Sequence, residues 1–300
     1  MYDLIIIGAG PAGLTSGIYA MRAKLNTILI EKTGAGGQIA LSDVIENYPG
    51  FPSISGFDLG KKFEEHARGL GLEIKFEEVE KVEDREDYKA VVTSEAEYKT
   101  KAIIIATGSQ PKRLGVKGED TFSGRGVSYC ATCDGFFFRD KDVVVVGGGD
   151  TAIKEAVFLT KMAKKVTIIH RRDQLRAEKI IQEKAFSNPK VNFIWDSIVE
   201  EIAGRDSVER VITKNVKTLE GMEIPTDGVF IFVGIKPNTG FIDIEKDESG
   251  FIRTKENLET SIPGIFAAGD CRTKLLRQVS TAVGDGALAA VMAEEYIEKQ

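Results

Sequence analysis

Short apolar runs alternate with glycine-rich turns along the chain. A run from Asp3 to Ile7 ends in a glycine loop, and small residues follow up to Arg22, which predicts a strand, a tight turn and a helix. A second strand is predicted from Thr27 to Ile30. A strand, a helix and a strand in this order predict a βαβ unit with parallel strands, and therefore an α/β fold.

The loop of this first unit has the spacing of a dinucleotide-binding fingerprint, Gly8-Ala9-Gly10-Pro11-Ala12-Gly13. Its glycines permit a tight turn, close backbone approach to a pyrophosphate and close helix packing. Glu31 follows the second strand, where an acid holds a ribose hydroxyl. The alternative is a glycine-rich turn without a ligand, but the flanking strand, helix and acid favour nucleotide binding.

The same pattern recurs from Val143. Val143 to Val146 is an apolar strand, followed by Gly147-Gly148-Gly149-Asp150-Thr151-Ala152, a helix to near Lys165 and a strand from Val166 to Ile169. That strand ends in His170-Arg171-Arg172, with Arg176 four residues further on. A fork of arginines suits a 2′-phosphate, whereas an acid suits a free ribose hydroxyl. We therefore expect FAD or NAD at the first loop and NADP(H) at the second; the alternative for the arginines is a solvated helix start.

The remaining pattern predicts how the two units are joined. Other strands are predicted at Lys101 to Gly108, near Asn192 to Trp195, Glu209 to Asn215 and Val229 to Val233, and within Ile262 to Asp270, with an alanine-rich amphipathic helix from Val279 to Glu298. Because the second unit starts near residue 141, the middle of the chain looks inserted into the first. The expected fold is two Rossmann-like, three-layer nucleotide-binding domains.

Cys130 and Cys133 form a CxxC motif between the two loops. Such a pair can be redox-active, metal-binding or incidental, and its place between two phosphate-cradling loops favours redox chemistry. Zinc needs about four ligands, and only Cys271, His66 and His170 remain as soft ligands, so no metal is expected. Asp134 is the expected proton shuttle for thiol release, with a helix N-cap as the alternative.

Composition narrows the function classes. The 300 residues suffice for two domains, and the net charge of −6 argues against nucleic-acid binding. No apolar run is long enough to span a membrane, and no signal peptide is recognised. Three cysteines, two of them in the CxxC, fit a reducing cytoplasm.

These motifs, in this order, resemble the low-molecular-weight thioredoxin reductases over nearly the whole chain. Further marks are Gly36-Gly37-Gln38, Ala106-Thr107-Gly108, Gly126-Val127-Ser128, Ala268-Gly269-Asp270 and Arg277-Gln278. The resemblance implies a homodimer in which residues 1–112 and 240–300 form the FAD domain. Residues 113–239 would form an inserted NADPH domain that carries the CxxC and rotates on hinges near Lys112 to Val116 and Gly234 to Thr239.

The resemblance also implies the site residues. FAD would contact Gly8, Gly10, Pro11, Ala12, Gly13, Glu31, Gly37, Gln38, Asn47, Thr107, Gly108, Gly269, Asp270, Arg277 and Gln278, with Asp270 on the ribityl chain. NADPH would contact Gly147, Gly149, Asp150, Thr151, His170, Arg171, Arg172 and Arg176. Cys130, Cys133 and Asp134 would carry out thiol exchange. Cys133 would face the flavin and Cys130 would attack the substrate, an assignment that spacing alone leaves open.

The expected activity is reduction of thioredoxin or a thioredoxin-like protein by NADPH. By resemblance, Arg125, Phe136 and Phe137 would contact thioredoxin, although aromatic residues here could instead pack into the core. Tyr129, where small residues are common, would adjust docking. Thr151 stands where serine is usual, and Cys271 stands where an apolar residue is common and is assigned no catalytic part.

Other functions share parts of this pattern. A reductase of a peroxiredoxin or glutaredoxin-like partner has the same chemistry, but such flavoproteins carry an extra N-terminal thiol domain, whereas this chain starts at the flavin loop. A ferredoxin–NADP reductase lacks the CxxC. A redox sensor would need an output segment, which the sequence does not display. Another electron donor in place of NADPH stays open.

Overall fold

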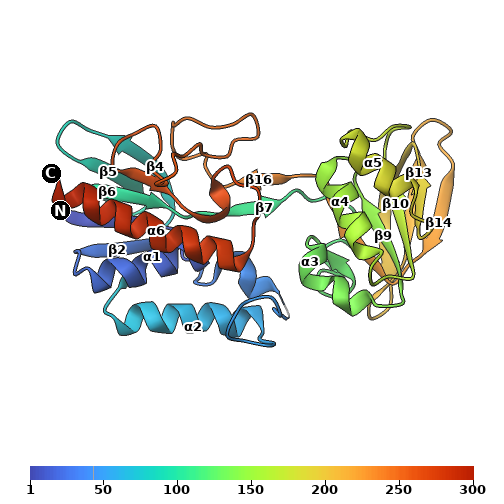
Figure 1. Cartoon of the computed structure of the whole chain (residues 1–300), viewed down its shortest axis with the longest axis horizontal. Coiled ribbons are helices and arrows are strands. Elements are labelled where there is room, and N and C mark those ends of the chain that lie inside the picture. Colours follow the sequence, from blue (N-terminus) through green and yellow to red (C-terminus); the bar gives the residue numbers. More distant parts are fainter. Residues whose placement is uncertain (43) are drawn as a thin grey trace. The chain divides into compact units, whose positions relative to one another are not determined.

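Parallel strands buried on both faces organise each of the two units that the chain forms. The computed structural model describes residues 1–42 and 44–300. One unit consists of Met1–Gln110 with Lys236–Gln300, and the other of Pro111–Ile235 (Figure 1). The predicted fold class, two α/β units built on parallel sheets, is confirmed.

The first unit contains β1 (Tyr2–Ile7), α1 (Pro11–Arg22), β2 (Thr27–Glu31), η1 (Gly37–Leu41), α2 (Gly56–Gly69), β3 (Glu73–Phe76), β4 (Val79–Asp84), β5 (Lys89–Thr93), β6 (Glu97–Ile105), β17 (Ile265–Ala267), η3 (Gly269–Cys271) and α6 (Val279–Glu298). The second contains β8 (Val127–Ser128), α3 (Ala131–Asp134), η2 (Gly135–Phe138), β9 (Asp142–Val146), α4 (Asp150–Leu159), β10 (Lys165–Ile169), α5 (Lys179–Phe186), β11 (Val191–Ile194), β12 (Ser197–Gly204), β13 (Val208–Asn215), β14 (Gly221–Pro225) and β15 (Gly228–Ile231). β7 (Ser109–Pro111) and β16 (Ile235–Pro237) lie where the chain crosses between them.

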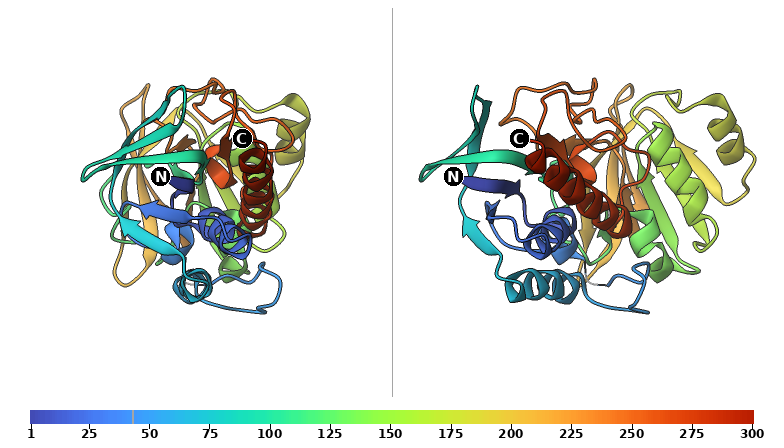
Figure 2. Two further views of the ribbon diagram at one scale, coloured as in Figure 1. Left: turned by 90° about the vertical axis from the view of Figure 1, so that its left-hand side faces the viewer. Right: turned by 60° about the vertical axis from the view of Figure 1, so that its left-hand side comes forward.

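The sheet of the first unit has the order β3-β2-β1-β6-β5-β4, with β17 beside β6. β1 runs parallel to both β2 and β6, as a βαβ unit requires. Leu4 and Ile6 join the core under α1 and α6, while Ile5 and Ile7 join the core on the opposite face. α1 and α6 lie side by side, as both views of Figure 2 show. Near-continuous apolar strands are therefore explained by burial on both faces.

The second unit is also built on a parallel sheet, but different elements pack on the two faces of that sheet. Its parallel sheet has the order β11-β10-β9-β15-β8, and β12, β13 and β14 form a separate antiparallel sheet. Val143 and Val145 pack with α4 on one face. Val144 and Val146 pack with β12 and β13 on the other face. The unit is thus three-layered, with helices on one side and strands on the other (Figure 1).

One predicted helix boundary is wrong. The helix after the second glycine loop was expected to reach Lys165, but α4 ends at Leu159. The Ala163 N–H donates to the Leu159 carbonyl and the Lys164 N–H to the Lys141 carbonyl, so a turn leads the chain back to the sheet. Lys165 therefore begins β10.

The two crossings pair with each other. β7 and β16 form a two-stranded sheet, and the Lys112 N–H donates to the Gly234 carbonyl at 2.8 Å. The chain passes from the first unit to the second between residues 110 and 111 and returns between residues 235 and 236. The expected domain boundaries were 112/113 and 239/240.

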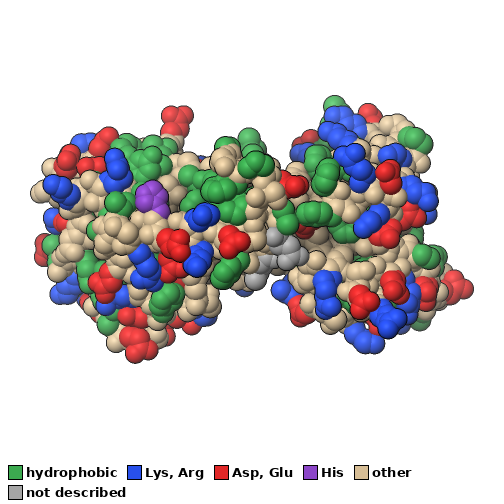
Figure 3. Space-filling view, turned by 90° about the horizontal axis from the view of Figure 1, so that it is seen from below, with side chains coloured by type: hydrophobic (Ala, Val, Ile, Leu, Met, Phe, Trp, Pro, Cys, Tyr) green, Lys and Arg blue, Asp and Glu red, His purple; other side chains and the backbone are tan. Residues whose placement is uncertain are grey.

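Among the described residues, no helix is long and apolar enough to cross a membrane. Acidic and basic side chains are interspersed on the face of each unit that Figure 3 shows.

Candidate functional site

An open pocket of about 960 Å³ lies in the first unit, at the carboxyl ends of β1, β2 and β6. This volume suits a cofactor or another sizeable ligand. Most residues expected around FAD line it, namely Gly8, Gly10, Pro11, Ala12, Glu31, Gly37, Gln38, Thr107, Gly108, Gly269, Asp270 and Gln278.

The glycine loop forms one wall of the pocket. Gly8 has φ +105°, and a Cβ there would meet the Ala106 carbonyl oxygen at 2.5 Å, so only glycine fits. Gly10 is the N-cap of α1 and has open space at its Cα, and Pro11 begins the helix. The α1 N-terminus thus presents backbone N–H groups and a positive dipole end, which suits a pyrophosphate. Gly13 does not line the pocket; a side chain there would overlap the Gly8 carbonyl.

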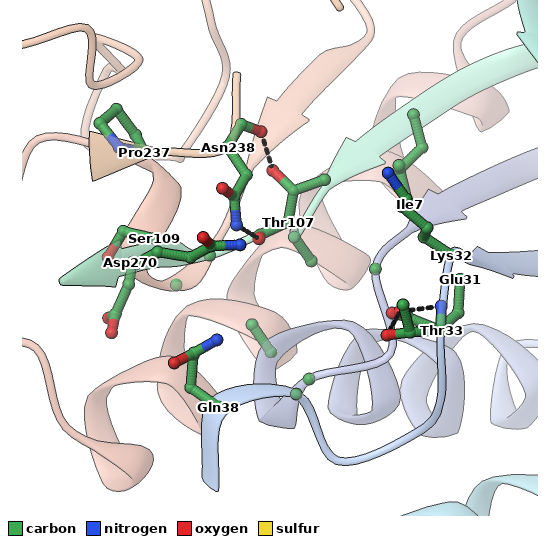
Figure 4. Close-up of a pocket in the computed structure, with 18 of the residues that line it drawn as sticks. Ile7, Glu31, Lys32, Thr33, Gln38, Thr107, Ser109, Pro237, Asn238 and Asp270 are labelled. Carbon is green, nitrogen blue, oxygen red and sulfur yellow. Dashed lines mark hydrogen bonds between the residues drawn. The ribbon is translucent and has the colours of Figure 1, made fainter. Parts of the chain in front are cut away.

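Glu31 is held in place by the loops around it. One carboxylate oxygen accepts the Ala9 N–H at 2.7 Å, and the other accepts the Thr33 N–H at 2.9 Å. In Figure 4, Glu31 and Thr33 lie on the opposite side of the pocket from Asp270. The carboxylate is therefore preorganised at one end of the pocket.

The turn η3 brings Asp270 to the other end. Gly269 adopts φ +76°, which turns the chain sharply after β17. Asp270 Oδ1 is buried and, among the described residues, has no hydrogen-bond partner, and burial raises the pKa of this carboxyl. Arg277 Nε is likewise buried without a partner, and burial lowers the Arg277 pKa. Buried polar atoms are normally satisfied, so the unpaired acceptor on Asp270, which lines the pocket, fits a bound polar cofactor such as FAD.

Three residues expected around FAD lie outside the pocket lining: Gly13, Asn47 and Arg277. Asn47 Nδ2 donates to Gln278 Oε1 at 3.1 Å, so Asn47 orients the side chain at the start of α6. The Arg277 guanidinium lies 4.2 Å from the centroid of the Phe251 ring.

Sequence reasoning missed Asn238, which lines the pocket on the returning crossing. Thr107 Oγ1 donates to the Asn238 carbonyl at 2.6 Å, and Asn238 Nδ2 donates to the Thr107 carbonyl at 2.9 Å (Figure 4). The change of pattern after Pro237-Asn238 was a usable signal for the return of the chain to the first unit. It did not indicate that this asparagine would reach Thr107, because that contact joins residues far apart in the sequence.

The second glycine loop is joined to the segment that follows β10. A side chain on Gly148 would overlap the His170 ring, so the imidazole packs directly against the loop. The Arg176 N–H donates to the Gly148 carbonyl at 2.7 Å, and the Glu178 N–H donates to Asp150 Oδ1 at 2.8 Å. Burial and then Arg176 lower the pKa of His170, so its ring is neutral near pH 7.

Arg171 and Arg172 are exposed in the loop after β10. The alternative of a solvated helix start is wrong, because α5 begins only at Lys179. Within the described ranges, no acidic side chain forms an ion pair with Arg171, Arg172 or Arg176. The guanidinium groups therefore remain available to an anionic ligand.

Cys130 and Cys133 are joined as a disulfide, with their Cα atoms 5.3 Å apart. They lie at the short helix α3, for which Cys130 is the N-cap. Asp134 is the last residue of α3 and occupies the N-cap position of η2, but no side-chain hydrogen bond caps either helix. Its Oδ2 instead accepts the Ser128 hydroxyl at 2.5 Å.

The aromatic residues after the CxxC divide between surface and core. Phe136 is 53% and Phe137 is 42% exposed on η2, whereas Phe138 is buried. Arg125 is also exposed. Tyr129 is half-buried, and its hydroxyl donates to the buried Glu119 at 2.7 Å. Burial and this hydrogen bond raise the Tyr129 pKa to about 12. Tyr129 is thus anchored inside its own unit.

Cys271, the last residue of η3, is fully buried. Its thiol lies 3.3 Å from the carbonyl oxygens of Ile105 and Ala268, either of which can accept its one proton. Burial raises its pKa to about 11. This thiol is therefore protonated at neutral pH and shielded from solvent.

Comparison with known proteins places this geometry in a family. The model of the pyridine nucleotide-disulphide oxidoreductases matches residues 2–286. The chain belongs to this family. The second unit carries the Cys130–Cys133 disulfide and the second glycine loop.

Relatives within the pyridine nucleotide-disulphide oxidoreductases match the whole chain. The thioredoxin reductase of Listeria monocytogenes is 50% identical, covering 100% of this chain and 95% of its own. The crystal structure of thioredoxin reductase from Streptococcus pyogenes is 51% identical with a TM-score of 0.95, covering 100% and 99% of the two chains. That of Lactococcus lactis is 47% identical with a TM-score of 0.70, covering 100% of both. The resemblance to thioredoxin reductases is confirmed.

Proposed function

We propose that this protein is a thioredoxin-disulfide reductase. Electrons from NADPH would reach the Cys130–Cys133 disulfide by way of bound FAD, and the resulting dithiol reduces oxidised thioredoxin or a thioredoxin-like protein. The observation that carries the proposal is the disulfide-bonded CxxC, in the same unit as a nucleotide loop and its arginine fork. Full-length similarity to thioredoxin reductases supports it.

The first unit is the FAD domain in this proposal. When bound, FAD supplies a carrier that takes two electrons as hydride and passes them to a disulfide. The α1 N-terminus with Gly8 and Gly10 would hold the pyrophosphate, and Glu31 would hold a ribose. Asp270, whose Oδ1 is unpaired, would accept a hydrogen bond from the ribityl chain.

The second unit is the NADPH domain. Gly147, Gly149 and the α4 N-terminus would bind the pyrophosphate, with Asp150 and Thr151 in the first turn. Arg171, Arg172 and Arg176 would bind the 2′-phosphate by charge-assisted hydrogen bonds. The neutral His170 ring packs against Gly148 of the loop.

Thiol exchange needs a thiolate and a proton donor. The Cys130 thiolate attacks one sulfur of the substrate disulfide, and the other substrate sulfur leaves as a thiolate. Cys133 then attacks Cys130 and releases the second substrate sulfur, which re-forms the Cys130–Cys133 disulfide. Asp134 gives a proton to the first departing thiolate and recovers one from solvent, and the proton that Cys133 loses as it attacks passes to the second departing thiolate.

The protein partner would dock on the surface that the second unit exposes beside the CxxC. Phe136 and Phe137 are exposed aromatic groups of the kind that anchor interfaces, and Arg125 adds a cation. A homodimer and a cytoplasmic location complete the proposal. They rest on the family resemblance and on the few cysteines of the chain.

An anaerobic titration tests the proposal. One equivalent of NADPH should bleach the flavin of the purified protein, and oxidised thioredoxin should restore its colour while gaining two thiols. If NADPH bleaches the flavin and the enzyme reduces a peroxiredoxin or glutaredoxin-like disulfide but not thioredoxin, the partner is a different protein from thioredoxin. If ferredoxin reduces the flavin and NADPH does not, the electron donor is ferredoxin. Bleaching without turnover of any disulfide would favour a redox sensor.

A further inference from the structure

Ser128 occupies a fixed position beside the CxxC. It ends β8, where it pairs with Phe230 in the parallel sheet, and it is 4% exposed. Gly126, two residues earlier, has φ +115° and lies against Val208, so the chain enters β8 in a defined direction. The Ser128 side chain therefore projects from a rigid strand into the segment that carries the thiols.

The Ser128 hydroxyl contacts both ends of α3. It lies 2.5 Å from Asp134 Oδ2 and 3.3 Å from the Cys130 carbonyl oxygen, and it accepts the Cys130 N–H at 3.1 Å. The Asp134 N–H closes the ring by donating to the Cys130 carbonyl at 3.1 Å. One hydroxyl thus links the main chain of Cys130 to the carboxyl group of the proposed proton shuttle.

A hydroxyl has one proton to donate and two lone pairs that accept. When Asp134 is a carboxylate, the Ser128 proton points to Oδ2. When Asp134 is protonated, its own O–H can donate to Ser128 Oγ, and the serine proton can turn to the Cys130 carbonyl. Because buried polar groups are costly when unpaired, this rotation keeps the pair satisfied in either protonation state.

We propose that Ser128 is a positioning residue for thiol–disulfide exchange, which holds Asp134 in register with Cys130 while Asp134 gains and loses its proton. The proposal rests on the proposed reductase function. The proton that Asp134 donates goes to the departing substrate thiolate, and the proton that replaces it comes from solvent. Ser128 gives up no net proton and no electrons; it only changes the acceptor of its hydrogen bond.

The test separates the two half-reactions of the holoenzyme. Ser128→Ala removes the hydroxyl, and Ser128→Thr keeps it. Thr213→Val is the control for loss of a buried hydroxyl in the same unit, because Thr213 is 1% exposed and donates to the Met222 carbonyl. Stopped-flow absorbance follows flavin reduction by NADPH, and in a second experiment the reduced enzyme is mixed with oxidised thioredoxin.

Flavin reduction should be equal in all variants. Transfer to thioredoxin should slow about tenfold in Ser128→Ala, the usual effect of losing a hydrogen bond to a charged group, and recover in Ser128→Thr. In an Asp134→Asn background, Ser128→Ala should cause no further slowing. A wild-type transfer rate in Ser128→Ala would overturn the proposal, as would the same slowing with Asp134→Asn present. A wild-type enzyme that fails to reduce thioredoxin would instead contradict the reductase function.

Discussion

The two thiols of the CxxC stand at different points of a four-residue helix, with Cys130 before its first turn and Cys133 within it. Both cysteines are half-buried, and Cys130 Sγ lies 3.4 Å from the Thr132 hydroxyl. Their exposure therefore does not distinguish the thiol that attacks the substrate from the thiol that faces the flavin.

Serine variants distinguish the two thiols. Cys130→Ser should leave flavin reduction by NADPH intact and abolish thioredoxin reduction, because the attacking thiol is lost. Its remaining Cys133 thiolate beside the oxidised flavin should give a long-wavelength charge-transfer band, whereas Cys133→Ser should lack this band. Absorbance spectra and turnover measure both effects. The reverse pattern would exchange the roles of the two cysteines.

Cys271 should prove inert. We expect Cys271→Ala to keep turnover, and the native thiol to resist iodoacetamide at pH 8, since the group is buried and its pKa is raised from 9.0 to about 11. The folded state then binds the proton more tightly than the unfolded state. The contribution of the Cys271 thiol to the free energy of unfolding therefore falls as pH rises from 9.0 to about 11. Urea titrations of both proteins across this range would show that fall only in the wild type.

Residue types with local roles could be placed from the sequence, and residues with tertiary roles could not. Gly8 lies on the pocket because the backbone of this turn requires glycine, and Gly10 leaves the start of α1 open to a ligand. Asn238 and Ser128 act through contacts with distant or differently oriented segments. No spacing rule specifies those contacts.

Among the elements, α6 was predicted over its full length because alanine and other apolar residues recur among polar ones from Val279 to Glu298. β12 and β14 were not predicted, although β13 between them was. Four of the five residues of β14 are exposed, so the strand has no alternating apolar pattern. It forms because it pairs with β13, a contact that the sequence of β14 alone does not predict. The end of α4 was missed because a turn there is stabilised by a contact with Lys141.

The loop after β10 should set the choice of nucleotide. Replacing Arg171 and Arg172 by Ala should raise the KM for NADPH by roughly a hundredfold, through loss of two charge-assisted contacts. The KM for NADH should change little, since NADH lacks the 2′-phosphate. Steady-state kinetics with both nucleotides measure the ratio. Lys217→Ala is a control, because this exposed lysine pairs with Asp173 and Asp196 in the same region. Equal use of both nucleotides by the wild type would contradict the assignment.

The joint between η3 and α6 should set FAD affinity. The carboxylate of Asp285 accepts the Gly269 N–H at 3.0 Å and pairs with Arg272 and Lys274, which lowers the Asp285 pKa. Asp285→Asn weakens this network, so the apoprotein should bind FAD about tenfold more weakly. Fluorescence titration measures the dissociation constant. Glu295→Gln, an exposed change on the same helix, should leave it unchanged; an equal loss in both variants would point to α6 as a whole.

At the scale of the whole molecule, one inserted unit carries both the nucleotide loop and the CxxC. Gly115 and Gly234, with φ of +74° and +127°, lie within the two expected hinges. The hydrogen bonds between Thr107 and Asn238 hold the returning chain to the first unit.

A reversible cross-link tests the rotation. Locking the units with the CxxC against the flavin should block flavin reduction by NADPH, and cutting the link should restore it, because domain closure is absorbed by a few loop residues. A pair of cysteines placed within the second unit alone serves as the control. Normal turnover of thioredoxin by the locked enzyme would exclude rotation.

The division of the first unit between both ends of the sequence also bears on how the protein is made. Its sheet needs β17, and its pocket needs Gln278 at the start of α6, yet β1 and α1 are synthesised first. The second unit is contiguous in the sequence, so it can fold on the ribosome before residues 236–300, which complete the first unit, have been synthesised. Flavin capture should therefore follow the synthesis of α6, and a nascent chain stalled before α6 should carry a folded second unit but no flavin.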